Sequence, residues 1–160
     1  GVGVMAKWGK VNFEAFKKVQ KKLAEISSAV DTAAFCEACC KELAARLLAL
    51  VIPATPVGQY PKSSGKKGGT LRRGWGAKSA GEAKTYAESL SVTKTGNTYS
   101  IEIINPVEYA SYVEYGHRTT GGGWVEGRYM LTISEEKLKS ITPAVLERKL
   151  NAFIKEVFNV

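Results

Sequence analysis

The feature that most constrains this chain is a long segment near its middle that cannot supply a hydrophobic core. Between Gly58 and Gly81 the sequence holds seven glycines and six lysines or arginines, and it holds no acidic residue. Pro53, Pro56 and Pro61 interrupt its start. A stretch of this composition buries too little apolar surface to offset the entropy lost on ordering. We therefore expect a long, basic, glycine-rich loop over about residues 53–81, and the core must come from the segments on either side.

Two helical patterns precede this loop. Apolar residues recur at helical spacing from about Asn12 to Ser28, which predicts a first helix. A second helix should begin at Asp31, a favourable N-cap residue, and end before Pro53. The second helix carries its cysteines on the apolar side. Because a zinc site needs four ligands, we interpret them as small core residues and expect no metal.

After the basic loop, alternating polar and apolar residues predict a small sheet. Residues 86–94 and 98–104 flank Thr95-Gly96-Asn97, the pattern of a β-hairpin. Asn105 then resembles the N-cap of a short helix that ends at Gly116.

The remaining residues predict a second loop and a helical C-terminus. The second glycine-rich loop covers about residues 116–128, and a helical segment around Ser134 to Ser140 leads to a last helix capped by Thr142 and opened by Pro143. The expected fold class is α+β: a small antiparallel sheet packed against the N-terminal helix pair and the C-terminal helix, with long glycine-rich loops.

Size and cysteine content limit the classes of protein. The chain has 160 residues, 44% of them hydrophobic, which predicts a single domain over residues 1–160 with a real core. The longest apolar run is Leu47 to Ile52, far short of the ~20 residues of a membrane span, so we expect no membrane partner. The cysteines Cys36, Cys39 and Cys40 are odd in number, which predicts a reducing compartment and no disulfide framework.

The positive charge is concentrated in the first half. The net charge is +8; residues 1–80 hold 14 basic and 5 acidic residues, whereas residues 81–160 hold 9 and 10. This asymmetry indicates an acidic partner. Two interpretations stay open. Tyr60 and Trp75 beside the basic residues suit a single-stranded nucleic acid, and the same loop suits an arm that orders on an acidic protein surface.

The sequence contains no pattern of residues that is typical of a known catalytic mechanism. The single histidine, His117, lies in the second glycine-rich loop beside Arg118, and no Gly-x-Ser-x-Gly elbow occurs. The glycine-rich segments lack the spacing of phosphate-binding loops, and no carboxylate pair has a physical argument behind it. We expect no catalytic residue, no cofactor and no metal.

Two stretches taken together resemble a bacteriophage family. Thr55-Pro-Val-Gly-Gln-Tyr-Pro61 with Gly68-Gly-Thr-Leu-Arg-Arg-Gly-Trp75 is similar to its "TPV … G-x-L-R-x-x-W" passage. Asn105-Pro-Val-Glu-Tyr-Ala-Ser-Tyr-Val-Glu-Tyr-Gly-His-Arg118 with Gly127-Arg-Tyr-Met-Leu131 resembles its "Y-A-x-Y-V-E-Y-G" signature and aromatic sequel. The family comprises the minor tail, head–tail joining or tail-completion proteins of long-tailed phages and prophages. The resemblance covers about residues 12–157.

The resemblance implies a structural virion protein of the neck or collar that is made in the host cytoplasm. Copies would form a closed ring of about six or twelve subunits between the head and the tail tube. Implied partners are the portal or connector proteins and the tail terminator or tail tube, with genomic DNA in the channel as a further contact. The alternatives are a tail terminator that caps the tube, or a nucleic-acid-binding protein that uses the basic loop.

The resemblance also implies roles for two residue sets. A loop that binds a partner or a second subunit would use Lys62, Lys66, Lys67, Arg72, Arg73 and Trp75. A structural or interface role falls to Tyr109, Tyr112, Glu114, Tyr115, Gly116, His117 and Arg118. By physical chemistry alone, the spacing of the three tyrosines on a short helix favours packing into the core.

Overall fold

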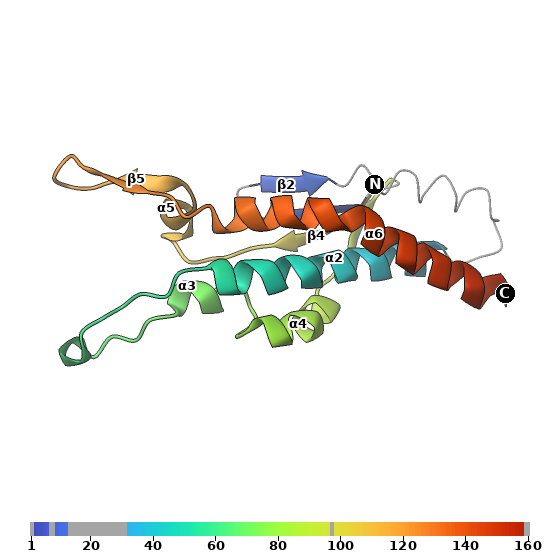
Figure 1. Cartoon of the computed structure of the whole chain (residues 1–160), viewed down its shortest axis with the longest axis horizontal. Coiled ribbons are helices and arrows are strands. Elements are labelled where there is room, and N and C mark those ends of the chain that lie inside the picture. The colour runs from blue at the N-terminus through green and yellow to red at the C-terminus, as the bar shows by residue number, and fades with distance from the viewer. Residues whose placement is uncertain (1, 7–8, 13–31, 97, 159–160) are drawn as a thin grey trace.

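The computed structural model describes residues 2–6, 9–12, 32–96 and 98–158 (Figure 1). The predicted helix over Asn12 to Ser28 lies outside these residues, except for Asn12, which ends a strand. The elements are β1 (Val2–Ala6), β2 (Gly9–Asn12), α2 (Thr32–Ala54), η1 (Lys62–Ser64), α3 (Thr70–Arg73), η2 (Ala80–Glu82), α4 (Ala83–Ser89), β3 (Thr93–Thr95), β4 (Thr98–Ile103), α5 (Ala110–Tyr115), β5 (Gly116–Arg118), β6 (Trp124–Glu126) and α6 (Met130–Phe158). The α+β fold class is confirmed.

Helix α2 is the centre of the molecule, because α4, α6, β1 and β4 all contact it. This element confirms the second predicted helix, although the helix continues through Pro53 to Ala54. Its buried positions are all apolar or cysteine, and burying a large aliphatic or aromatic side chain contributes ~1.5–3 kcal/mol. The residues of α2 that are buried in the core are Phe35, Cys36, Cys39, Cys40, Leu43, Ala44, Leu47, Leu48, Val51 and Ile52.

The cysteines of α2 are core residues, as predicted. All three side chains are buried. Burial raises the pKa of Cys39 and of Cys40 to about 12. With pKa values this high, these thiols stay protonated near neutral pH. Because a thiol must ionise to act as a nucleophile or a metal ligand, they serve packing.

The main sheet has the strand order β2-β1-β4-β3. The β1–β2 and β3–β4 pairs are antiparallel, as expected for this sheet, but the central β1–β4 pair is parallel, with Val4 opposite Ile101. The N-terminal β1–β2 hairpin was not predicted. Strands of five and four residues are too short for periodicity to distinguish them from irregular chain.

The predicted hairpin forms with a shorter first strand. Gly96 has a φ of +61° at the turn, and β3 and β4 flank it. The expected strand over residues 86–92 is wrong, because residues 83–89 form α4. Ala83 and Ala87 are buried four residues apart, and small side chains at this spacing let one face of the helix approach α2 closely.

The C-terminus is one continuous helix, so the predicted helix start at Thr142 and Pro143 is wrong. Thr142 is buried, and its hydroxyl donates to the Leu138 carbonyl at 2.7 Å, a bond within the helix. The apolar stripe of α6 packs along α2 and holds the backbone helical across Pro143. Where the N-terminal part of α2 meets the C-terminal part of α6, the ring centroids of Phe35 and Phe153 lie 4.6 Å apart.

Two arms project from one end of the molecule, opposite the C-terminal end of α6 (Figure 1). We call residues 55–69 the basic arm and residues 116–128 the hairpin arm. The hairpin arm was expected to be a loop, but β5 and β6 pair antiparallel in it. The expected loop over 53–81 is too long, because its C-terminal part enters the core through Leu71, Trp75 and Ala77.

Candidate partner-binding surface

The base of the basic arm is fastened to the end of α2 through Thr55. The buried Thr55 hydroxyl donates to the Val51 carbonyl at 2.6 Å and accepts the indole N–H of Trp75 at 2.8 Å. Trp75 is 1% exposed. The assignment of Trp75 to a partner-binding loop is therefore wrong, because its ring fills the core and its nitrogen bonds within the chain.

Arg72 closes the same helix end. Its guanidinium donates to the Thr55 carbonyl from Nε at 3.1 Å and from Nη2 at 2.8 Å, and Nη2 also reaches the Pro53 carbonyl at 3.3 Å. The last carbonyls of a helix lack partners within it, and a cation there is favourable. Arg72 thus has a structural role at α2, although the sequence placed it among partner contacts.

Arg73 stabilises the C-terminal limb of the basic arm, where the arm meets α3. Its Nη1 donates to the Gly68 carbonyl at 3.3 Å and its Nη2 to the Thr70 hydroxyl at 3.4 Å. The two limbs touch at the glycines, since a Cβ on Gly68 would collide with the carbonyl oxygen of Gly58. The base of the arm is accordingly built from close backbone contacts that larger residues would prevent.

The three predicted lysines are exposed along the basic arm: Lys62, Lys66 and Lys67. Lys66 Nζ lies 5.9 Å from the centre of the Tyr60 ring, a cation–π contact worth ~0.5–1 kcal/mol at an exposed site. Since no acidic residue occurs between Gly58 and Gly81, nothing in the arm's own sequence neutralises this charge.

Asn105 joins the two signature stretches. It is fully buried; its Nδ2 donates to the Leu71 carbonyl at 2.8 Å and its Oδ1 accepts the Val107 N–H at 3.2 Å. A Cβ on Gly74 would collide with Asn105 Oδ1. Asn105 is therefore not the N-cap of α5, which begins five residues later at Ala110.

Helix α5 presents its tyrosines outward, so the inward packing favoured by their spacing is wrong. Ala110 and Glu114, four residues apart, occupy the buried side. The tyrosines Tyr109, Tyr112 and Tyr115 are exposed, Tyr112 by 57%. A helix of six residues has a single buried face, and here the smallest residue and a carboxylate take it.

Glu114 holds the first turn of α6. Its Oε2 accepts the Leu131 N–H at 2.8 Å, and its Oε1 accepts the Thr132 N–H at 2.9 Å and the Thr132 hydroxyl at 2.7 Å. The carboxylate satisfies donors that a helix start leaves unpaired, and its charge suits that end of the helix. Sequence reasoning missed this role because the donors lie 17 and 18 residues downstream.

The hairpin arm is seated on α5 through Gly116. Gly116 has a φ of +87°, and a Cβ there would lie 2.8 Å from the Trp124 ring and 2.9 Å from the Gly127 nitrogen. The His117 ring stacks on Tyr112 with centroids 5.3 Å apart. Arg118 is exposed and pairs with Trp124 in the strand ladder. These contacts fix the direction in which the arm leaves the body.

We call the end of the molecule from which both arms project the arm end; its segments, residues 55–69 and 109–133, carry several exposed aromatic and aliphatic side chains. Trp124 is 55% exposed, and the Tyr115 and Tyr129 rings meet edge to face at 6.4 Å. Interfaces are enriched in such residues, and patches of them mark interaction sites. We define the aromatic face by Tyr60, Tyr109, Tyr112, Tyr115, Trp124, Val125, Tyr129 and Ile133.

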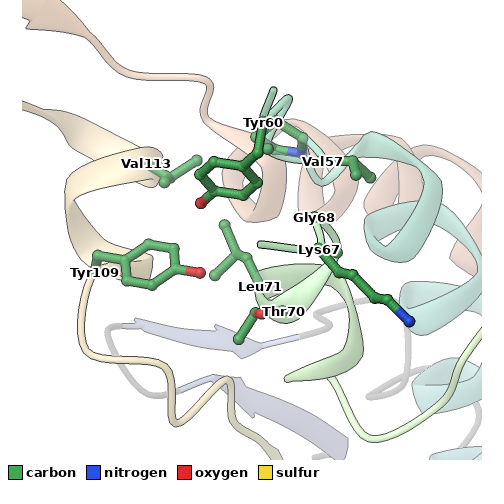
Figure 2. Close-up of a pocket in the computed structure, with 11 residues that line it drawn as sticks. Val57, Tyr60, Lys67, Gly68, Thr70, Leu71, Tyr109 and Val113 are labelled. Atoms are coloured by element: carbon green, nitrogen blue, oxygen red, sulfur yellow. The ribbon is translucent and has the colours of Figure 1, made fainter. Parts of the chain in front are cut away.

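A pocket of about 180 Å³ opens between the basic arm and α5 (Figure 2). Leu71 and Val113 are apolar lining residues, and the hydroxyl groups of Tyr60 and Tyr109 point into the space beside Leu71. Both signature stretches contribute to it. Its lining residues are Pro56, Val57, Gly58, Tyr60, Lys67, Gly68, Gly69, Thr70, Leu71, Tyr109 and Val113.

Other kinds of site have little support in the described part of the chain. Among residues 2–6, 9–12, 32–96 and 98–158, no group of three or more His, Cys, Asp or Glu side chains could hold a metal ion. No helix within those same ranges has both the length and the apolar character needed to cross a bilayer.

The comparisons with known proteins agree with the signatures. The family model described as "Bacteriophage HK97-gp10, putative tail-component" matches residues 17–116, more than half of the chain and both signature cores. Neither a curated protein nor a solved structure matches the chain significantly. Thr55, Arg72, Trp75, Asn105 and Glu114, whose contacts brace the bases of the arms, lie within the matched region. This chain therefore belongs to the HK97-gp10-like family of phage tail components.

Proposed function

We propose that this tail component is a non-enzymatic structural protein of the neck, where its copies form a ring that joins the head to the tail tube. The observation that carries the proposal is the arm end. Two arms project from one end of the body (Figure 1), and the segments at that end carry exposed aromatic side chains, while buried signature residues hold the bases of the arms. A joining protein needs projecting surfaces that meet its neighbours.

The construction of the arms supports this role. Each arm is tied down at its base, by the hydrogen bonds of Arg72 and Trp75 to Thr55 in one case and by the close packing around Gly116 in the other. Preorganised segments lose less entropy on binding, so more of the contact energy becomes affinity. The partners in this proposal are the portal or connector proteins on one side and the tail terminator or tail tube on the other, reached after synthesis in the host cytoplasm.

Electron microscopy of a lysate from a phage or prophage that lacks this gene tests the proposal. Separate full heads and finished tails are expected, because the joining step alone would fail. Tails of uncontrolled length would instead identify a tail terminator. Joined and infectious particles would contradict any structural role in the neck.

Nucleic-acid binding is the second candidate, favoured by the three exposed lysines beside Tyr60. Its test is the salt dependence of affinity for single-stranded DNA. If all three lysines contact phosphates, changing them to alanine should reduce the slope of log affinity against log salt by about 2. Arg72 is unsuitable for this test, because its guanidinium is bonded to the end of α2. The neck proposal predicts no such change.

A further inference from the structure

We propose that the pocket between the basic arm and α5 anchors an aromatic or aliphatic side chain carried by an acidic segment of a neighbouring virion protein. The inference rests on the proposed function, because it names what the arm end holds in the particle. Three properties of the pocket carry it: its size, its lining and the charge around it.

The size of the pocket matches a side chain. Its volume of about 180 Å³ is below the ~300–1,000 Å³ of typical small-molecule sites. Pockets that receive one large side chain are the usual centres of binding energy in protein interfaces. The occupant is therefore a residue of a larger molecule that also contacts the exposed surface around the opening.

The lining selects an apolar group with polar atoms close to it. Val57, Leu71 and Val113 give aliphatic surface, and the Tyr60 and Tyr109 hydroxyls point into the space beside Leu71 (Figure 2). Tyrosine hydroxyls both donate and accept hydrogen bonds, so they suit the peptide groups that flank an inserted side chain. Nucleic-acid bases bind by stacking on open aromatic faces, whereas Tyr60 and Tyr109 turn their hydroxyl ends toward this space (Figure 2).

The charge around the pocket selects an acidic segment. Lys67 lines the pocket, and Lys62 and Lys66 lie exposed on the same arm. Trp124 of a second copy is a poor occupant, because it sits in a hairpin arm that carries Arg118 and Arg128 against a single acid, Glu126. Two positive arms repel each other, whereas an acidic segment is attracted.

Site-specific photocrosslinking in assembled particles tests the occupant. A benzoylphenylalanine in place of the exposed, pocket-lining Thr70 is compared with the same group in place of Thr85, an exposed threonine on α4 that does not line the pocket. The expected product joins position 70 to another virion protein, at a segment with more acidic than basic residues and an apolar side chain. Crosslinks to a second copy or to DNA, or a yield no higher than at position 85, would overturn the inference.

Substitution provides a second readout. Thr70→Trp should fill the pocket and lower infectious titre at least tenfold, with Thr85→Trp as the matched control. Lys67→Glu should act in the same direction, and Lys155→Glu, the same charge change on exposed α6, should not. Thermal unfolding of each purified variant checks that the chain still folds.

The two proposals fail in different ways. If deletion of the gene leaves joined particles, the neck role is wrong. If deletion blocks joining but Thr70→Trp and Lys67→Glu particles assemble as efficiently as their controls, the neck role stands and the pocket inference is wrong.

Discussion

At the level of single residues, Glu114 is the residue that ties helix α5 to the start of α6, whereas the tyrosines beside it are exposed. Its buried carboxylate accepts three hydrogen bonds from the first turn of α6, while its own backbone carbonyl accepts the Tyr129 N–H at 3.0 Å. Charge-assisted bonds of this kind are about twice as strong as neutral ones. The Tyr-Ala-x-Tyr-Val-Glu-Tyr-Gly signature therefore combines buried structural residues with exposed tyrosines in alternation.

Glu114→Ala should lower the free energy of unfolding by ~2–4 kcal/mol, because buried donors at the start of α6 lose their acceptor. Urea denaturation followed by far-UV circular dichroism measures the change. Glu108→Ala is the control, since Glu108 is exposed, and it should stay within ~0.5 kcal/mol of the parent protein. Equal stability of the two variants would contradict the capping role.

A second carboxylate near this site makes stability depend on pH. Burial, with repulsion from Glu114 and Glu136 adding to it, raises the pKa of Glu135 from 4.5 to about 7, although Lys139 lowers it. The folded state therefore keeps a proton that the unfolded chain releases. Stability attributable to this group is present below pH 4.5 and is lost as the pH rises towards 7.

Glu135→Gln should consequently be more stable than the parent protein at pH 8, by up to ~2 kcal/mol after allowance for the partial exposure of Glu135 to solvent. Near pH 4 the two proteins should be equally stable. Chemical denaturation at a series of pH values measures the difference. If the stability difference between the variant and the parent protein does not change with pH, Glu135 has the same pKa in the folded and unfolded states and the expectation is wrong.

At the scale of elements, each arm depends on one tight junction with the body. The basic arm is held where Arg72 and Trp75 reach Thr55, and the hairpin arm is held at Gly116. The sequence predicted both arms as loops, the basic arm from its glycines, prolines and unbalanced basic charge and the hairpin arm from its glycines. It missed the paired strands of the hairpin arm, because three-residue strands rich in exposed side chains have no apolar alternation.

Gly116→Ala should weaken the hairpin arm, because alanine is strained at a φ of +87° and its Cβ would press on the Val125 carbonyl and the Gly127 nitrogen. We expect a loss of ~2 kcal/mol or more, together with faster amide exchange in residues 116–128. Gly121→Ala is the matched control, since a Cβ at Gly121 meets nothing within 4 Å and its φ is not positive. Similar exchange rates in the two variants would refute the junction.

At the level of the whole molecule, the features that could be predicted from the sequence are those marked by a regular apolar repeat or a turn motif. The helical pattern of α2, the β3–β4 turn and the apolar stripe of α6 all correspond to observed structure. The strand expected over residues 86–92 and the inward tyrosines were wrong, because both depend on which side of a short helix faces α2 or α6. That choice is made by tertiary packing, which a period of a few residues does not determine.

The candidate site was predicted only in part for the same reason. Lys62, Lys66 and Lys67 are exposed on an arm as expected, but Arg72 and Trp75 turn inward to Thr55, 17 and 20 residues earlier in the chain. The pocket is formed where residues 56–71 lie beside Tyr109 and Val113. Amino-acid composition does not predict that these distant segments come together.

A reconstruction of the intact particle at side-chain resolution would show which surfaces of this chain meet its neighbours. We expect to find the chain in the neck, with the basic arm and the aromatic face buried against neighbouring subunits and α4 not required for those contacts. A chain found in the particle with both arms open to solvent, or contacting its neighbours through α4 and the C-terminal end of α6 instead, would contradict this expectation.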